Sequence, residues 1–161
     1  MNVPSLTTQI ETENTAALAD LAGVCAGTCV LTLDGDLPVQ FLAPGDRVVT
    51  RSGARVLTAI TVTLLYDAEI IRIASSALGH NRPEDDLFLA PAQQILLRDW
   101  RAMALYQSPT ALVEAQRLAD GDYIRKETVA EVRIYTLHFA REEIIFAGGV
   151  ELACAQAKVS A

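Results

Sequence analysis

One nine-residue pattern occurs twice in this chain of 161 residues, and it constrains the fold more than any other feature. Residues 40–48 and 116–124 both follow Gln-x-Leu-Ala-x-Gly-Asp-x-aliphatic, 76 positions apart, which is close to half of the chain. Glycine suits a turn position with positive φ, and aspartate can bond the backbone beyond it. Gly-Asp turns are common, so chance is one explanation. The recurrence of Gln and Leu at matching offsets favours two similar halves related by a pseudo-two-fold axis.

Short apolar runs separated by Gly, Pro and Asp turns predict an all-β, or mainly β, domain. One short helix is expected from Ser108-Pro109 to about Leu118, because Ser is a favoured N-cap and Pro a favoured first helical residue. Residues 1–15 are polar and are expected to form a loose arm, and residues 16–22 fit a short helix that ends at Gly23. The expected strands are 28–33, 47–50, 56–65, 69–74, 87–90, 94–97, 100–105, 123–125, 131–139 and 144–147.

Charge and composition exclude several classes of function. The chain carries 13 Lys+Arg against 20 Asp+Glu, for a net charge of −7, and its basic residues do not cluster. This balance argues against nucleic acid or an anionic membrane surface as a partner, and no apolar stretch reaches the roughly 18 residues of a membrane span. The first 20 residues lack Lys and Arg, and three cysteines do not make a disulfide framework, so a cytoplasmic location is expected. The Cys and His spacing is not that of a zinc site, and no cofactor is expected.

Several segments, in their order along the chain, resemble the Hint domain, the module shared by hedgehog C-terminal domains and inteins, and in particular bacterial Hint-like proteins. The resemblance implies a compact all-β horseshoe of two pseudo-symmetric halves. It covers residues 23–152 and leaves 1–22 as an N-terminal arm and 153–161 as a C-terminal tail. It rests on residues 27–35, 42–48, 77–79, 87–91, 118–122 and 144–149.

The resemblance also implies a self-directed chemistry. In the family, a Cys thiol attacks the peptide carbonyl just before it, which gives a thioester in an N-to-S acyl shift. A Ser/Thr-x-x-His pair polarises the scissile amide and protonates its nitrogen, and in inteins a terminal Asn then cyclises. The chemistry needs these groups because an amide nitrogen leaves poorly unless it is protonated, and the tetrahedral oxyanion needs hydrogen-bond donors.

Matched residue by residue, the family's catalytic positions hold other side chains here. The nucleophile falls on Gly23, the hydroxyl of the Ser/Thr-x-x-His pair on Ala90 and its imidazole on Gln93. A late Asp-x-His of bacterial relatives falls on Ala140 and Glu142. Gln93 can donate a hydrogen bond, but near pH 7 it cannot shuttle a proton.

The counts of His and Asn agree without any alignment. The two histidines are His80 and His138, and Ala77 and Tyr135 stand three positions before them, so neither belongs to a Ser/Thr-x-x-His pair. Asn81 is the last asparagine, which excludes cyclisation of a terminal Asn.

The sequence therefore predicts a Hint fold without its processing residues, which acts, if at all, as a peptide- or protein-binding module and not as an enzyme. The alternative is residual self-cleavage by an N-to-S acyl shift at Cys25, which lies three positions before Thr28. That reaction would break the bond between Val24 and Cys25. The competing interpretation of Cys25 is a small buried residue near the start of a strand.

Overall fold

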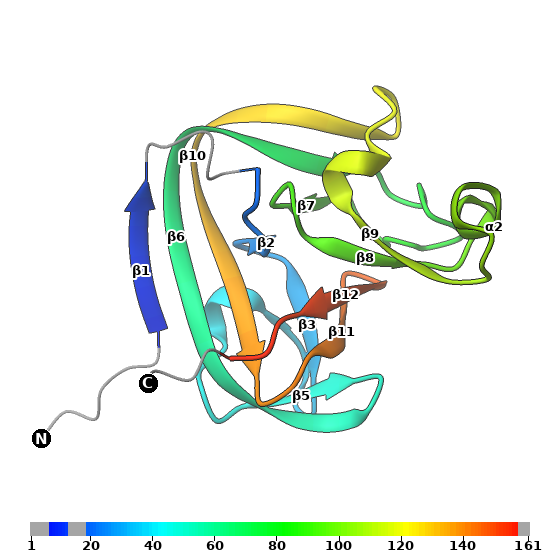
Figure 1. The fold of residues 1–161 in the computed structure, drawn as a ribbon. Helices are drawn as coiled ribbons and strands as arrows, with labels where there is room; N and C mark the ends of the chain where they lie inside the picture. The colour runs from blue at the N-terminus through cyan, green and yellow to red at the C-terminus, as the bar shows by residue number, and fades with distance from the viewer. Residues whose placement is uncertain (1–6, 13–18, 158–161) are drawn as a thin grey trace, which may run out of the picture.

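Two long antiparallel strands form the frame of the molecule (Figure 1). β6 (Gly53–Ile73) and β10 (Ile124–Phe139) pair from Ile124 opposite Ile73 to Phe139 opposite Leu57, with a bulge at His138 and Phe139. Both strands bend around most of the shorter strands, whereas β1 lies on the outer side of β6 (Figure 1). The computed structural model describes residues 7–12 and 19–157.

The shorter elements add to the sheet that the long pair begins. The sheet runs in the order β10-β2-β7-β6-β5-β3-β11-β12-β8-β9, with β1 added to β6 and β4 added to β3. These elements are β1 (Thr7–Thr12), β2 (Val24–Cys25), β3 (Cys29–Thr32), β4 (Gly35–Pro38), η1 (Val39–Phe41), β5 (Arg47–Thr50), β7 (Leu87–Leu89), β8 (Gln94–Leu97), α2 (Trp100–Tyr106), β9 (Ala111–Glu114), η2 (Ala115–Leu118), β11 (Glu143–Ala147) and β12 (Val150–Cys154).

The repeated sequence pattern corresponds to a repeated structure. β4 and β9 begin 76 positions apart, and each leads into a 3-10 turn, η1 or η2, and then into the Gly-Asp turn. Leu42 and Leu118, the matching leucines, are both buried, and so are Val39 and Ala115. The expectation of two pseudo-symmetric β halves is therefore confirmed.

The strands before β4 and β9 repeat at a different offset. β3 pairs with β4 and β8 pairs with β9, with Cys29 opposite Pro38 and Gln94 opposite Glu114, which places β3 and β8 65 positions apart. The offset differs because residues 33–34 connect the first pair, whereas residues 98–110, with α2, connect the second. Val24 of β2 and Leu89 of β7 are also 65 positions apart and pair with each other, so the pseudo-two-fold axis passes between them.

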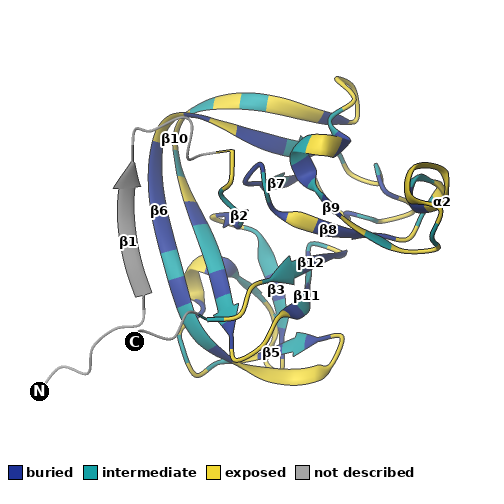
Figure 2. Cartoon of the chain, viewed as in Figure 1, coloured by how far each residue is buried: buried dark blue, intermediate teal, exposed yellow. Residues whose placement is uncertain are grey.

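The core draws on both halves, and its largest fully buried side chains include Leu57, Ile73, Ile95, Phe139 and Leu152. A smaller cluster of buried residues lies beside the pseudo-two-fold axis and consists of Cys25, Leu65, Ala68, Ile70, Ala90 and Ile134. Exposed positions gather at the β5–β6 turn and on α2 (Figure 2).

The expected helix at 109–118 is wrong. Residues 111–114 form β9, because the pairing with β8 satisfies their backbone and buries Val113, and only 115–118 form a 3-10 turn. The helix lies instead at Trp100–Tyr106, where a strand was expected, and the Asp99 side chain caps it by accepting a hydrogen bond from the Arg101 N–H at 3.1 Å.

Three further expectations differ from the structure. The strands expected at 56–65 and 69–74 form one strand, because β10 pairs with residues on both sides of their junction. Asp67, at the junction, has a φ of +48°. Within the expected loose arm, Thr7–Thr12 form β1, which pairs in parallel with residues 60–65 of β6. The helix expected at 16–22 lies partly outside the described residues, and its described end, 19–22, is not helical. In the described part of the chain, no helix is both long and apolar enough to cross a membrane.

Candidate functional site

The segment that enters β2 is held by three hydrogen bonds from two other parts of the fold, η2 and residues 90–92. The Gln116 side chain donates to the Ala19 carbonyl at 3.0 Å, and the Ala92 N–H donates to the Leu21 carbonyl at 2.9 Å. The Ala90 N–H donates to the Gly23 carbonyl at 3.0 Å. Residues 19–23 therefore follow a defined path along residues 90–92, and the peptide bond between positions 22 and 23 has a fixed place.

The residue that contacts this peptide bond is Thr136, on β10. Its hydroxyl donates a hydrogen bond of 2.6 Å to the carbonyl oxygen of Ala22. A hydroxyl has one proton to donate, so this bond commits it to the Ala22 carbonyl. Thr136 thus occupies the position of a donor to the carbonyl just before Gly23, which is where an oxyanion would form if that carbonyl were attacked.

Gly23 has no side chain and no space for one. Its φ is +144°, and a Cβ there would lie 2.6 Å from Ile134 Cγ2, 2.7 Å from the Tyr135 carbonyl oxygen and 2.9 Å from Thr136 Oγ1. The Tyr135 carbonyl belongs to β10, whose backbone is paired with β2 at this point. A side chain at position 23 is therefore excluded both by backbone conformation and by the closeness of β10.

Gln93 lies in the same place, buried to 4% exposure. Its amide nitrogen donates to the carbonyl of Ala153 at 2.8 Å and to the carbonyl of Gln94 at 3.0 Å. The side-chain amide has two N–H hydrogens, and both are used. Gln93 therefore ties β8 to β12 and has no hydrogen left for the peptide bond at Gly23.

Gly23, Gln93 and Thr136 line one small cavity of about 40 Å³, together with the backbone of β12. Cys154, at the end of β12, also lines it. Burial, with a smaller contribution from the nearby Glu143 carboxylate, raises the pKa of the Cys154 thiol to about 12. Since the thiolate is the nucleophilic form, this environment suppresses the reactivity of the one thiol in the cavity.

Cys25, the candidate displaced nucleophile, lies in the apolar cluster beside the pseudo-two-fold axis. It is 6% exposed, and burial raises the pKa of its thiol to about 12. Within the described residues its side chain has no hydrogen-bond partner, and Ala90 packs in the same cluster. The environment of Cys25 is that of a structural cysteine, with no base beside it to remove the proton.

The other matched positions lie outside the small cavity. Ala90 is buried and contributes only its backbone, to Gly23. Ala140 is exposed at the β10–β11 turn. Glu142 lines a larger cleft of about 480 Å³ that adjoins the small cavity and shares Ala22 and Cys154 with it. The structure thus brings Gly23, Ala90 and Gln93 together and keeps Ala140 and Glu142 apart from them.

Thr136 is the site residue that sequence reasoning missed. It stands on an alternating strand among Tyr135, Leu137 and His138, and nothing in its neighbours along the chain marks it. Only the crossing of β10 over residues 22–24 brings its hydroxyl to the Ala22 carbonyl. Among residues 7–12 and 19–157, no three His, Cys, Asp or Glu side chains gather in a way that could hold a metal ion.

Comparison with solved structures defines the class of fold. The bacterial intein-like domain from Clostridium thermocellum matches with a TM-score of 0.58 at 15% identity, over 84% of this chain and 98% of that one. The TvoVMA intein matches with 0.56 at 11% identity, over 82% and 96%. The gp41-1 intein matches with 0.52 at 11% identity, over 83% and 98%. The fold is therefore that of intein-like domains.

The sequence makes the assignment more specific. The family described as the Hint domain matches residues 22–155, which is most of the chain, and the protein belongs to that family. Among curated proteins, none matches this chain.

Proposed function

We propose that this protein is a Hint domain that has lost the self-processing reaction and binds an extended peptide. The observation that carries the first half of the proposal is the lack of space for a side chain at Gly23, the position before β2. A side chain at Gly23 would collide with β10, and the backbone conformation is unfavourable for any residue with a Cβ, which supports the loss of a nucleophile at this position. Both N–H groups of Gln93 donate to the carbonyls of Gln94 and Ala153, so Gln93 offers no proton donor to the amide nitrogen of Gly23.

The second half of the proposal is supported by the cleft of about 480 Å³ beside the small cavity. Such a volume is within the range of ligand sites, and residues 19–23 and β12 form its inner wall with fixed backbone. Asp20, Glu114, Glu142 and Glu143 line it. Only Glu143 has an ion-pair partner in the described part of the chain, Arg55 at 3.4 Å. An extended peptide with basic side chains is the occupant that complements this charge.

The test of the binding half is fluorescence anisotropy with two labelled, unstructured peptide pools, one rich in Lys and one rich in Glu. Saturable binding of the Lys-rich pool is expected, and the variant with Glu114→Gln and Glu142→Gln should weaken it about tenfold, equivalent to about 1.4 kcal/mol. The matched control is the variant with Asp34→Asn and Asp122→Asn, which removes two exposed charges outside the cleft. Absence of saturable binding, or equal loss in both variants, would refute the peptide proposal.

The test of the inactive half is intact-mass spectrometry of the protein after incubation with hydroxylamine, which cleaves a thioester. A single full-length mass of about 17.3 kDa over several days is expected. A fragment that begins at Cys25, absent from the Cys25→Ala variant, would overturn the proposal and establish residual self-cleavage at that residue. This outcome is independent of the peptide-binding result.

A further inference from the structure

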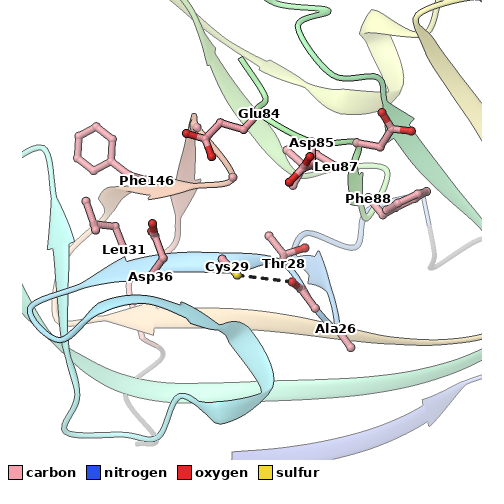
Figure 3. A pocket seen from close by; sticks show the side chains of 14 residues that line it. Ala26, Thr28, Cys29, Leu31, Asp36, Glu84, Asp85, Leu87, Phe88 and Phe146 are labelled. Atoms are coloured by element: carbon pink, nitrogen blue, oxygen red, sulfur yellow. Dashed lines mark hydrogen bonds between the residues drawn. The ribbon is translucent and has the colours of Figure 1, made fainter. Parts of the chain in front are cut away.

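A second cavity, of about 560 Å³, lies away from the site described above and shares no lining residue with either of its cavities. It is enclosed by β3 and the start of β4, by residues 84–88, and by the turn between β11 and β12 (Figure 3). The volume is within the range of small-ligand sites.

Among the described residues, three of the four carboxylates that line this cavity have no cation of their own. Asp36 extends from the β4 side, and Glu84 and Asp85 come from the opposite wall (Figure 3). Across the described residues, none of the three has an ion-pair or side-chain hydrogen-bond partner. The fourth, Asp86, also lines the cavity but differs, because Arg72 and the Ser75 N–H hold its carboxylate and lower its pKa.

The cavity also has apolar ends. Phe146 and Leu31 lie at one end and Phe88 at the other (Figure 3). The Phe88 ring already has the Arg72 guanidinium 5.9 Å from its centroid. In the described part of the chain, Phe146 has no such partner. Aromatic faces beside carboxylates suit an organic cation with a carbon stem, since the ring attracts the charge and packs against the stem.

The wall that carries Glu84 is held in place. The Glu84 N–H donates to the Gly148 carbonyl at 3.0 Å, and the Ser75 hydroxyl donates to the Glu84 carbonyl at 2.6 Å. A Cβ at Gly149 would lie 2.8 Å from the Asn81 carbonyl oxygen, so the β11–β12 turn packs directly against this segment. The cavity is therefore preformed, which lowers the entropic cost of binding a ligand.

Pseudo-symmetry relates this cavity to the proposed peptide cleft. The offset of 65 positions that relates β3 to β8 also relates its lining residues 27, 29, 85 and 87 to residues 92, 94, 20 and 22, which line the peptide cleft. The offset of 76 relates Asp36 to Leu112 in the same way. The second cavity is thus the counterpart of the cleft in the other half of the molecule.

From this combination we infer that the second cavity is a binding site for an organic cation, an alkylammonium or guanidinium group on an apolar stem. Asp36, Glu84 and Asp85 neutralise the charge, and Phe146 with Leu31 packs against the stem. The same chemistry is present in a free polyamine and in a Lys or Arg side chain of a peptide. The site is distinct from the proposed peptide cleft and does not depend on it.

The test is isothermal titration calorimetry of the full chain with two probes, spermidine and an acetylated, amidated pentapeptide that carries one Arg and one Lys. Saturable binding of at least one probe is expected, and its identity distinguishes the free amine from the peptide source. Each probe should also slow the alkylation of Cys29, which lines the cavity, by iodoacetamide, as measured by peptide mass spectrometry. This second readout locates the ligand.

The variant with Asp36→Asn, Glu84→Gln and Asp85→Asn should weaken binding at least about tenfold and abolish the protection of Cys29.

The matched control neutralises three exposed carboxylates elsewhere, Asp34→Asn, Asp67→Asn and Glu131→Gln, so both variants change the net charge from −7 to −4. This control should retain the affinity and the protection. Equal weakening in the two variants would reduce the effect to general attraction by an acidic protein and overturn the proposal. So would the absence of saturable binding, or binding that leaves Cys29 unprotected. In the Glu114→Gln and Glu142→Gln variant both probes should still protect Cys29, which separates this site from the peptide cleft.

Discussion

The Gly23→Ala variant tests whether the position before β2 has room for any side chain. Alanine adds one carbon, which would lie within 3 Å of Ile134 Cγ2, the Tyr135 carbonyl oxygen and Thr136 Oγ1. The φ of +144° costs about 1–3 kcal/mol for a residue with a Cβ. Overpacking against β10 costs about another 1–3 kcal/mol, because the pairing with β2 prevents the carbonyl from moving away.

The two costs together give an expected destabilisation of about 2–6 kcal/mol. Urea denaturation followed by far-UV circular dichroism measures it. With a slope of about 2 kcal/mol/M, the midpoint should fall by about 1–3 M. The slope itself should stay unchanged, because the variant alters packing but does not change how much surface becomes exposed on unfolding.

The control is Gly35→Ala, at the β3–β4 turn. Gly35 has a φ of +101°, and no atom lies within 4 Å of a Cβ placed there, so this variant has the backbone cost without the collision. Its midpoint should fall by clearly less than that of Gly23→Ala. If the two midpoints fall equally, β10 yields at position 23, and the argument that a nucleophile cannot return there is wrong.

Three further predictions concern single side chains. Thr136→Val should lower the free energy of unfolding by about 1–3 kcal/mol in urea titrations, because the Ala22 carbonyl loses its donor, and Thr136→Ser should restore most of the loss. Glu151→Ala should cost about 3–5 kcal/mol, because this carboxylate, 2% exposed, neutralises three arginines, and Glu131→Gln at an exposed position should cost almost nothing. The Cys25 thiol should react with iodoacetamide at pH 8 about 1,000-fold more slowly in the folded protein than in urea, since its pKa is raised from 9.0 to about 12. Because the folded pKa lies above the unfolded one, the free energy of unfolding is fully retained below pH 9 and falls as the pH rises from 9 to 12. Cys25→Ala should make this fall less steep, and equal slopes in the two proteins would contradict the assignment.

The strand content and the two halves could be predicted because they are written in local patterns. Glycines at turn positions have positive φ here, Gly45 and Gly121 among them, and the aspartates beside them bond the turn backbone. The location of the helix could not be predicted in the same way. Ser108-Pro109 has the local features of a helix start, yet the pairing of β9 with β8 buries Val113 and prevails over them. The Asp99 cap of the actual helix was a weaker signal, because the apolar run after it also fits a strand.

Part of the candidate site could also be predicted from the sequence. The family resemblance pointed to Gly23, Ala90 and Gln93, and the structure brings these three together through the Gly23–Ala90 hydrogen bond and the small cavity that Gly23 and Gln93 line. Thr136 could not be found, because its role depends on a strand that follows more than 110 residues later in the chain.

The sequence by itself determined the class of fold and the two halves, and it predicts that other side chains occupy the family's catalytic positions. These follow from residue identity and from contacts between near neighbours in the chain. Only the tertiary structure decided that Gly23 has no space for a side chain, that both hydrogens of Gln93 are committed, and that Asp36 faces Glu84 and Asp85 across a cavity. Each of these depends on atoms from strands far apart in the chain, and a linear pattern does not encode the distance between them.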